Sequence, residues 1–177
     1  MSLATESALL VAVPAVEALV GEHRARLDPS APRGVPPHVT VLYPFMAPDD
    51  IGGDVVECLA DGFAACPRFD FGLDNVNWFG DTVVYLAPEP ADAFRELTRV
   101  AMNLFPAFPP YRGAYADLTP HLTIGQDAPI DVLRAAADAV ASGLPIRTSA
   151  TAITLMIGGT EPASWRVHTR FSFTNHG

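Results

Sequence analysis

The sequence predicts an α+β fold of two similar lobes, in which two largely antiparallel sheets carry helices on the outside and enclose a central cleft. Two observations support it. One His-centred pattern occurs twice, as Pro37-His38-Val39-Thr40-Val41 and as Pro120-His121-Leu122-Thr123-Ile124. The order of short apolar strands and helices that precedes the first copy is repeated before the second. We therefore treat residues 1–177 as one domain, in which each lobe contributes one His-x-Thr strand.

The first half of the chain is expected to alternate strands and helices. Ala8–Val13 is a short apolar run suited to a buried strand. Pro14 stands where a helix favours its first residue, ahead of apolar residues at helical spacing. A loop from Asp28 to Pro36 leads into the first His/Thr strand. Further elements are expected as a helix over 54–65 and a strand over 69–78.

The second half repeats this order. A strand is expected over 82–87, and Pro88-Glu89-Pro90 is expected to open a helix whose apolar residues include Phe94 and Leu97. A proline-rich loop from Pro106 to Pro120 leads into the second His/Thr strand. The remaining elements are expected as a helix over 130–141 and strands over 146–157 and 165–173. Related lobes would place the two His/Thr strands side by side.

Each His shares a strand face with its Thr. Successive side chains of a strand point to opposite faces, so His38 and Thr40 project together while Val39 and Val41 project toward a core. His121 and Thr123 pair in the same way. A single copy would be read as a buried or edge-strand histidine with its ring hydrogen-bonded. Two copies in one chain are rare by chance, and they favour a cleft where four polar side chains meet.

Composition excludes several classes of protein. Hydrophobic residues make up 49% of the chain and charged residues 18%, which is typical of a folded soluble protein. All 11 basic residues are arginines, against 20 acidic residues, and the net charge is -9. This surface would repel an extended nucleic acid, although a small phosphorylated ligand remains compatible with it. The lack of lysine is typical of a bacterial protein from a GC-rich genome.

Nothing in the sequence predicts a membrane or a disulfide framework. The apolar run over 8–13 has no basic flank and is bracketed by Glu6 and Glu17, so we expect neither a signal peptide nor a membrane span. Cys58 and Cys66 are too few for a zinc ribbon, and their spacing does not fit a redox dithiol. We interpret them as small apolar residues of a cytoplasmic protein, which we expect to be a monomer.

Two imidazoles that face one point provide what phosphodiester chemistry needs near neutral pH. One neutral ring accepts a proton from the nucleophile, and one protonated ring gives a proton to the leaving oxygen. Thr40 and Thr123 are placed to donate hydrogen bonds to the non-bridging phosphate oxygens. A metal site is the alternative, but it needs further ligands, and neither motif contains a Cys or a carboxylate. We therefore expect no metal and no cofactor.

These features resemble the 2H phosphoesterase superfamily, particularly its bacterial 2′-5′ RNA ligase-like branch. The resemblance is carried by the paired His-x-Thr elements, by the run from Pro37 to Phe45 and by the loop Pro109-Pro110-Tyr111-Arg112-Gly113. It implies a bilobal fold with His38, Thr40, His121 and Thr123 in the cleft. It also implies a metal-independent reaction on RNA-type phosphoesters: opening a 2′,3′-cyclic phosphate to a 2′-phosphate, joining RNA ends through a 2′-5′ linkage, or acting on cyclic phosphates of small nucleotides.

Other residues are weaker candidates. Arg112 is a candidate phosphate clamp, and four aromatic residues are candidates to stack a nucleobase. Strict alternation places Tyr43 on the face away from His38. The three histidines without a Thr partner are interpreted as structural or surface residues. The aromatic candidates are Tyr43, Trp78, Phe79 and Tyr115, and the other histidines are His23, His168 and His176.

Together these inferences predict a cyclic phosphodiesterase in which His38 and His121 are the catalytic acid and base, and Thr40 and Thr123 bind phosphate. The expected partner is a small nucleotide or an RNA-end cyclic phosphate. Because lysine is absent and the charge is negative, we expect a small substrate in preference to long RNA. The alternatives are 2′-5′ RNA ligase activity and a non-catalytic domain that binds a nucleotide or a phosphorylated ligand.

Overall fold

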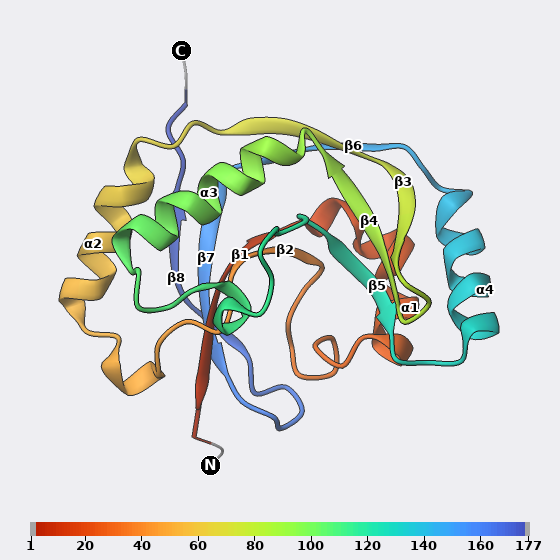
Figure 1. The fold of residues 1–177 in the computed structure, drawn as a ribbon, viewed down its shortest axis with the longest axis horizontal. Coiled ribbons are helices and arrows are strands. Elements are labelled where there is room, and N and C mark those ends of the chain that lie inside the picture. The colour runs from red at the N-terminus through yellow and green to blue at the C-terminus, as the bar shows by residue number, and fades with distance from the viewer. Residues whose placement is uncertain (1–2, 176–177) are drawn as a thin grey trace.

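The computed structural model describes residues 3–175 as strands and helices that alternate along much of the chain (Figure 1). The strands are β1 (Glu6–Ala12), β2 (His38–Leu42), β3 (Phe69–Phe79), β4 (Val83–Glu89), β5 (Leu122–Gln126), β6 (Ile146–Ala150), β7 (Ala152–Gly158) and β8 (Arg166–Ser172). The α-helices are α1 (Glu17–Leu27), α2 (Gly53–Ala64), α3 (Ala91–Leu104) and α4 (Ile130–Ala141). Short 3₁₀ helices are η1 (Pro14–Val16), η2 (Pro48–Asp50) and η3 (Pro110–Gly113). Within the described range, no helix combines the length and apolar character that crossing a membrane requires.

The strands form two four-stranded antiparallel sheets, which confirms the predicted α+β fold class. Their orders are β2-β1-β7-β8 and β5-β4-β3-β6. Each His/Thr strand is the edge strand of its sheet, and its inner neighbour is the strand that precedes it by one helix in the sequence. Both sheets draw strands from both halves of the chain. The matching positions of the two His/Thr strands in their sheets support the interpretation of two related lobes. The division into lobes stays a prediction.

Two of the helices pack against a strand of the sheet to which the strand before them does not belong. The helix α1 follows β1 in sequence but packs against β5 of the other sheet, and α3 follows β4 but packs against β2. Figure 1 shows the result, with α2 and α3 beside the sheet of β1, and α1 and α4 beside the sheet of β5. The helix that links β1 to β2 therefore covers β5, and the helix that links β4 to β5 covers β2. Each sheet thus packs against a helix that follows a strand of the other sheet.

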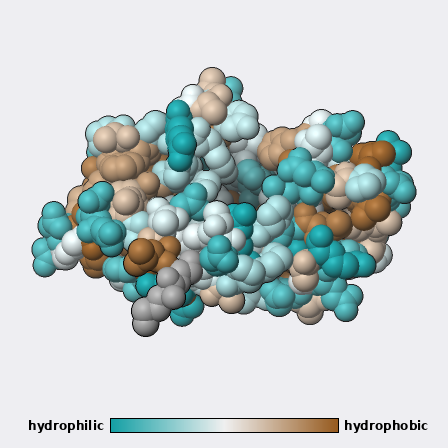
Figure 2. Space-filling view, turned by 90° about the horizontal axis from the view of Figure 1, so that it is seen from below, coloured by the Kyte–Doolittle hydropathy of each residue, from teal (hydrophilic) through white to brown (hydrophobic). Residues whose placement is uncertain are grey.

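One continuous core joins these layers. It includes residues of both His/Thr strands, such as Val39 and Ile124, together with Phe63 of α2 and Phe94 of α3, all at most 2% exposed. A smaller apolar cluster around Trp165 lies against the opposite face of β1. Figure 2 shows apolar residues toward both ends of the molecule and mainly hydrophilic residues across the middle of the face seen from below.

Two sequence expectations about elements are wrong. The strand expected over 146–157 is two strands in different sheets, because Ala150 pairs with Phe69 of β3 whereas Ala152 pairs with Ser172 of β8. Apolar periodicity does not reveal which partner a strand takes. Residues 88 and 89 end β4, and the helix begins only at Ala91, after Pro90 at its N-cap.

Candidate active site

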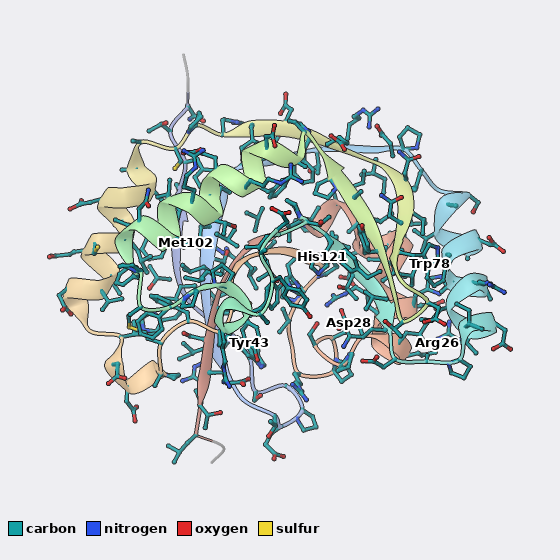
Figure 3. All side chains as sticks on the ribbon, in the orientation of Figure 1. Arg26, Asp28, Tyr43, Trp78, Met102 and His121 are labelled. Carbon is teal, nitrogen blue, oxygen red and sulfur yellow. The ribbon has the colours of Figure 1, made fainter. Side chains whose placement is uncertain are left out.

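The two His/Thr strands face each other across one cleft. The edge strands β2 and β5 lie in contact although they belong to different sheets. The cleft has a volume of about 260 Å³, and His38, Thr40, His121 and Thr123 all line it. In Figure 3 His121 is labelled near the middle of the molecule, and Asp28 and Tyr43 are labelled below it. The structure therefore brings together the four residues that the sequence singles out.

A β-bulge follows each of these threonines. Thr40 pairs with Leu10 and Leu42 with Leu9, which leaves Val41 as the extra residue. The second strand repeats this, because Thr123 pairs with Tyr85 and the next pair skips one residue. A bulge inserts one residue and reverses the side-chain alternation after it. The bulge and the end of β2 at Leu42 bring the Tyr43 side chain to the His38 side, which corrects the expectation from strict alternation.

Both histidine rings are held in the same way. Nδ1 of His38 lies 2.8 Å from the carbonyl oxygen of Pro36, and Nδ1 of His121 lies 2.8 Å from that of Thr119. A carbonyl accepts hydrogen bonds only, so each ring donates its Nδ1–H to the residue two positions earlier. The other nitrogen, Nε2, then carries the lone pair in the neutral ring. Two identical anchors thus leave two Nε2 atoms free for proton transfer.

Burial is the largest cause of the lowered pKa of both histidine rings. It lowers the pKa of His38 from 6.5 to about 4, with the positive charge of Arg24 and the proximity of His121 acting in the same direction. The hydrogen bond to Pro36 and the negative charge of Asp28 oppose this shift. Burial also lowers the pKa of His121, against the Thr119 hydrogen bond and Asp28. A phosphate anion bound between the rings would stabilise a proton there and raise these pKa values again.

A buried ion pair lies at the edge of the cleft. Asp28 follows the last turn of α1, lines the cleft and is 5% exposed. Its carboxylate accepts hydrogen bonds from Nε of Arg24 at 3.0 Å and from the backbone N and the hydroxyl of Ser30 at 2.9 and 2.8 Å, and Nη2 of Arg24 lies 3.0 Å from the same carboxylate in an ion pair. Sequence reasoning missed this pair, although an Arg and an Asp four residues apart near a helix end are a visible ion-pair signal.

Aromatic residues form one wall beside His121. The Phe79 and Tyr85 rings stack at 4.2 Å, and their centroids lie 5.1 and 5.6 Å from the His121 ring. Phe79 and Tyr115 also line an adjoining hollow of about 370 Å³, together with Gln126. Phe79 and Tyr115 are therefore placed where a planar group could stack. No counterpart of this wall flanks His38 among the ring contacts of the described residues.

The loop around η3 places Tyr111 over the cleft. Tyr111 and Arg112 both adopt left-handed backbone conformations, with φ of 50° and 55°, which are costly for residues other than glycine. The Tyr111 backbone N donates a hydrogen bond to the Tyr43 carbonyl at 2.7 Å. Burial raises the pKa of the Tyr111 hydroxyl, and a hydrogen bond with Thr40 opposes the rise. Tyr111 faces the site, whereas Arg112 is exposed and does not line the cleft.

Trp78 lies outside the cleft, which corrects its expected position. It lines a separate hollow with Arg134 and Asp138 of α4, because alternate residues of β3 face opposite sides and Phe79 takes the cleft side. Figure 3 likewise shows Trp78 toward α4.

His168 is exposed on β8, and His23 lies partly buried on α1 with its Nδ1 unpartnered. His176 lies outside the described residues.

Residues 3–175 contain no group of three or more His, Cys, Asp or Glu side chains placed to hold a metal ion. The nearest approach to such a group at the site is the pair of imidazoles with Asp28, whose carboxylate is already engaged by Arg24 and Ser30. Both Nδ1 atoms are likewise committed to backbone carbonyls. Two imidazoles with two hydroxyl groups beside them are chemically suited to acid–base catalysis.

The fold and the paired His/Thr strands define a 2H phosphoesterase-type protein. The family model described as the 2'-5' RNA ligase superfamily matches residues 12–161, and the chain belongs to this family. No curated protein sequence matches it. The apo structure of Escherichia coli LigT is similar at 19% identity and a TM-score of 0.61, over 98% of this chain and 99% of that one.

Two further solved structures share the fold. TT0787 of Thermus thermophilus is 17% identical with a TM-score of 0.63, over 94% of this chain and 97% of that chain. A structure titled only phosphoesterase is 18% identical with a TM-score of 0.58, over 97% of this chain and 99% of that chain. Escherichia coli LigT has also been crystallised with 3'-AMP, ATP, NADP+ and phosphate.

Proposed function

We propose that this protein is a metal-independent phosphoesterase that opens 2′,3′-cyclic phosphates of nucleotides or RNA ends to 2′-phosphates. One observation carries the proposal. His38 and His121 have identical Nδ1 anchors and line the same cleft, each with a threonine two residues further along its strand. Two free Nε2 atoms and two hydroxyl groups around one point match the needs of an in-line displacement at phosphorus.

The reaction would proceed in one displacement. One neutral imidazole takes a proton from water as the water oxygen forms a bond to phosphorus. The bond between phosphorus and the ribose O3′ breaks, and the second imidazole, protonated, gives its proton to O3′. Thr40 and Thr123 donate hydrogen bonds to the non-bridging oxygens, where charge accumulates in the transition state. The product keeps its phosphate on O2′, and the two rings regain their starting protonation by exchange with solvent.

Family membership supports the substrate class. The chain belongs to the 2'-5' RNA ligase superfamily, one structure of similar fold is titled phosphoesterase, and Escherichia coli LigT has been crystallised with 3'-AMP and with phosphate. These ligands belong to that protein, at 20% identity or less. They are consistent with a nucleotide phosphate in the cleft of this chain. The aromatic side chains of Phe79, Tyr111 and Tyr115 would hold the base or ribose beside it.

The decisive experiment measures hydrolysis of 2′,3′-cyclic nucleoside monophosphates in the presence of EDTA, with the product resolved as the 2′- or the 3′-phosphate. The wild-type protein should form the 2′-phosphate. His38→Ala and His121→Ala should each lower turnover by about 10²–10⁴-fold, because each removes one proton-transfer group. Both variants should stay folded by circular dichroism, since neither ring lies in the main apolar core.

The matched control is His168→Ala, which removes an exposed histidine of β8 outside the cleft and should retain wild-type turnover. Full activity in both cleft variants would refute the proposal. Turnover that EDTA abolishes would refute its metal independence.

The ligase and binding alternatives give different outcomes in the same series. A ligase would join an RNA end carrying a 2′,3′-cyclic phosphate to a 5′-hydroxyl end and would hydrolyse mononucleotides poorly. A binding domain would show saturable heat on titration with cyclic nucleotide and form no product. The two free Nε2 atoms favour catalysis, because binding alone does not require two proton-transfer groups.

A further inference from the structure

The ion pair of Arg24 and Asp28 is more heavily hydrogen-bonded than other ion pairs of the described residues. Both side chains are almost fully buried, at 3% and 5% exposed, whereas those of the other pairs are at least 37% exposed. Removing two charges from water is costly unless their geometry and hydrogen bonds compensate for it. Here the carboxylate accepts bonds from Arg24 and Ser30 on both of its oxygens. A pair of this kind, at the edge of the proposed catalytic cleft, calls for a functional explanation.

The pair also holds the loop that orients His38. Nη2 of Arg24 donates hydrogen bonds to the Ser30 hydroxyl at 3.0 Å and to the Val35 carbonyl at 3.2 Å. The next carbonyl along the chain, that of Pro36, accepts the Nδ1–H of His38. Arg24 therefore fixes the backbone one residue before the anchor of this ring. The backbone of the loop is further tied by the bond from Val35 N to Ser30 O at 3.1 Å.

The two members of the pair lie differently relative to the cleft. Asp28 lines the cavity with both His38 and His121, whereas Arg24 does not line it and lies behind the loop next to His38. In Figure 3 Asp28 lies between the label of His121 and the outer end of α1. The Asp28 carboxylate thus lies in the same cavity as both histidine rings, whereas the Arg24 guanidinium lies on the His38 side only.

We infer that the buried Arg24–Asp28 pair is a positioning device that makes the two histidines unequal, so that His121 takes up a proton more readily than His38. In the proposed reaction His121 then acts as the acid and His38 as the base. The inference rests on the proposed function for the acid and base roles. The charge arrangement itself is a property of the protein without substrate.

The electrostatic surroundings of the two rings support this division. Burial is the largest cause of the lowered pKa of both rings, and at each ring the hydrogen bond to a backbone carbonyl opposes it. The neighbouring charges then differ: Arg24 and His121 lower the pKa of His38 further, and Asp28 opposes this less strongly than Arg24 acts. For His121 the one neighbouring charge with an effect is Asp28, which raises its pKa. Environments that push two pKa values apart mark the acid and the base of a pair. The other charged or titratable groups that line the cleft and its adjoining hollows are Glu6, Arg33, Tyr43, Tyr111, Tyr115, Asp117, Arg95 and Arg99.

The first test is an NMR titration of the histidine Cε1–H signals in the substrate-free wild-type protein. Spectra of His38→Gln and His121→Gln assign the two signals. We expect His121 to titrate at a higher pH than His38, and the reverse order would overturn the inference. This readout needs no turnover, so it stands even if the protein proves inactive on cyclic phosphates, and a failure of the inference is distinguishable from a failure of the proposed function.

The second test removes the charge pair as a unit. Asp28→Asn alone would leave the Arg24 charge buried without a partner, so the variant of choice is the double substitution Arg24→Gln and Asp28→Asn. It should lower the titration midpoint of His121 and raise that of His38, and the gap between them should narrow by about half a unit or more. An unchanged gap in the folded double variant would overturn the inference.

The control is a second charge pair of the same chemistry. Arg147→Gln with Asp74→Asn removes the ion pair between β6 and β3, which does not line the cleft. It should leave both histidine midpoints unchanged. If the protein hydrolyses cyclic phosphates, the alkaline limb of its kcat/KM profile should move to lower pH in the Arg24/Asp28 double variant and stay in place in the control. A purely structural role for the pair would lower activity without moving this limb.

Discussion

At the scale of single residues, the site is built from two copies of one local arrangement. Each histidine follows a proline and donates Nδ1–H to the carbonyl two residues earlier, and each strand bulges just after its threonine. Local sequence contributes to the histidine anchors, because proline restricts the residue before it to extended backbone. What differs is the surroundings: Phe79 and Tyr85 flank His121, and Arg24 lies near His38.

The lowered pKa of His38 predicts a specific pH dependence of stability. The unfolded chain binds a proton on this residue below its ordinary pKa of 6.5, whereas the folded protein resists it down to about 4. Stability is therefore fully present above pH 6.5 and is lost as the pH falls toward 4. Between pH 7 and pH 5, the free energy of unfolding should fall by about 2 kcal/mol more in the wild type than in His38→Gln.

Urea unfolding at the two pH values measures this difference. His168→Gln is the control, since it substitutes an exposed histidine, and it should keep the wild-type pH dependence. Equal losses in the wild type and His38→Gln would show that His38 keeps an ordinary pKa in the folded protein.

At the scale of elements, the exchange of helices between the sheets positions the two His/Thr strands. The hydroxyl of Thr98 on α3 donates a hydrogen bond to the Val41 carbonyl of β2 at 2.8 Å. On the other side, α1 approaches β5 at Gly125, where a Cβ atom would lie 2.7 Å from Cβ of Leu27. Helix α1 therefore also sets the distance between Asp28, just past its end, and His121, the residue directly before β5.

Gly125→Ala should separate α1 from β5. The added methyl group meets the base of the Leu27 side chain, which cannot swing away as a flexible end would, so one of the two elements must shift. Overpacking of this kind should lower the free energy of unfolding by about 1–3 kcal/mol. Turnover should fall as well, because His121 moves with β5. Urea unfolding and the cyclic phosphate assay measure the two effects.

The control for this substitution is Gly53→Ala at the first residue of α2, where an added Cβ has nothing within 4 Å. Alanine favours helix, so this variant should be as stable as the wild type or more stable by up to about 1 kcal/mol. Wild-type stability in Gly125→Ala would show that α1 can be displaced from β5 without cost.

At the scale of the whole molecule, charge and topology act together. The net charge of -9 surrounds a cleft of about 260 Å³ with adjoining hollows of about 370 and 900 Å³. The largest hollow lies along α3 and contains Arg95 and Arg99, but each of these arginines is paired with a carboxylate of its own helix. Local room for a nucleotide is therefore present without an extended positive surface.

This charge distribution predicts a preference for small substrates. The protein should bind a 2′,3′-cyclic mononucleotide about as tightly as an RNA oligonucleotide with the same cyclic end, because additional phosphates gain little from an acidic surface. Competition binding at two salt concentrations measures it, and the two ligands should show similar, shallow salt dependence. Much tighter, steeply salt-dependent binding of the oligonucleotide would mean that the chain has an RNA-binding path.

The sequence by itself determined the secondary structure almost throughout, the α+β class and the four polar residues of the cleft. Strand alternation and helical spacing are local, and the duplicated His-x-Thr pattern shows which residues share a face. The family could be identified from the same residues, and the family model confirms it.

Only the tertiary structure decided which sheet each strand joins, that α1 and α3 cover each other's His/Thr strands, and that Tyr43 faces the cleft while Trp78 does not. It also decided that Asp28 and Tyr111 line the site. These features depend on contacts between residues far apart in the chain and on bulges that reverse the alternation, neither of which leaves a periodic signal in the sequence. The two motifs are alike because their local sequences are alike. The two histidines differ because different residues pack around them.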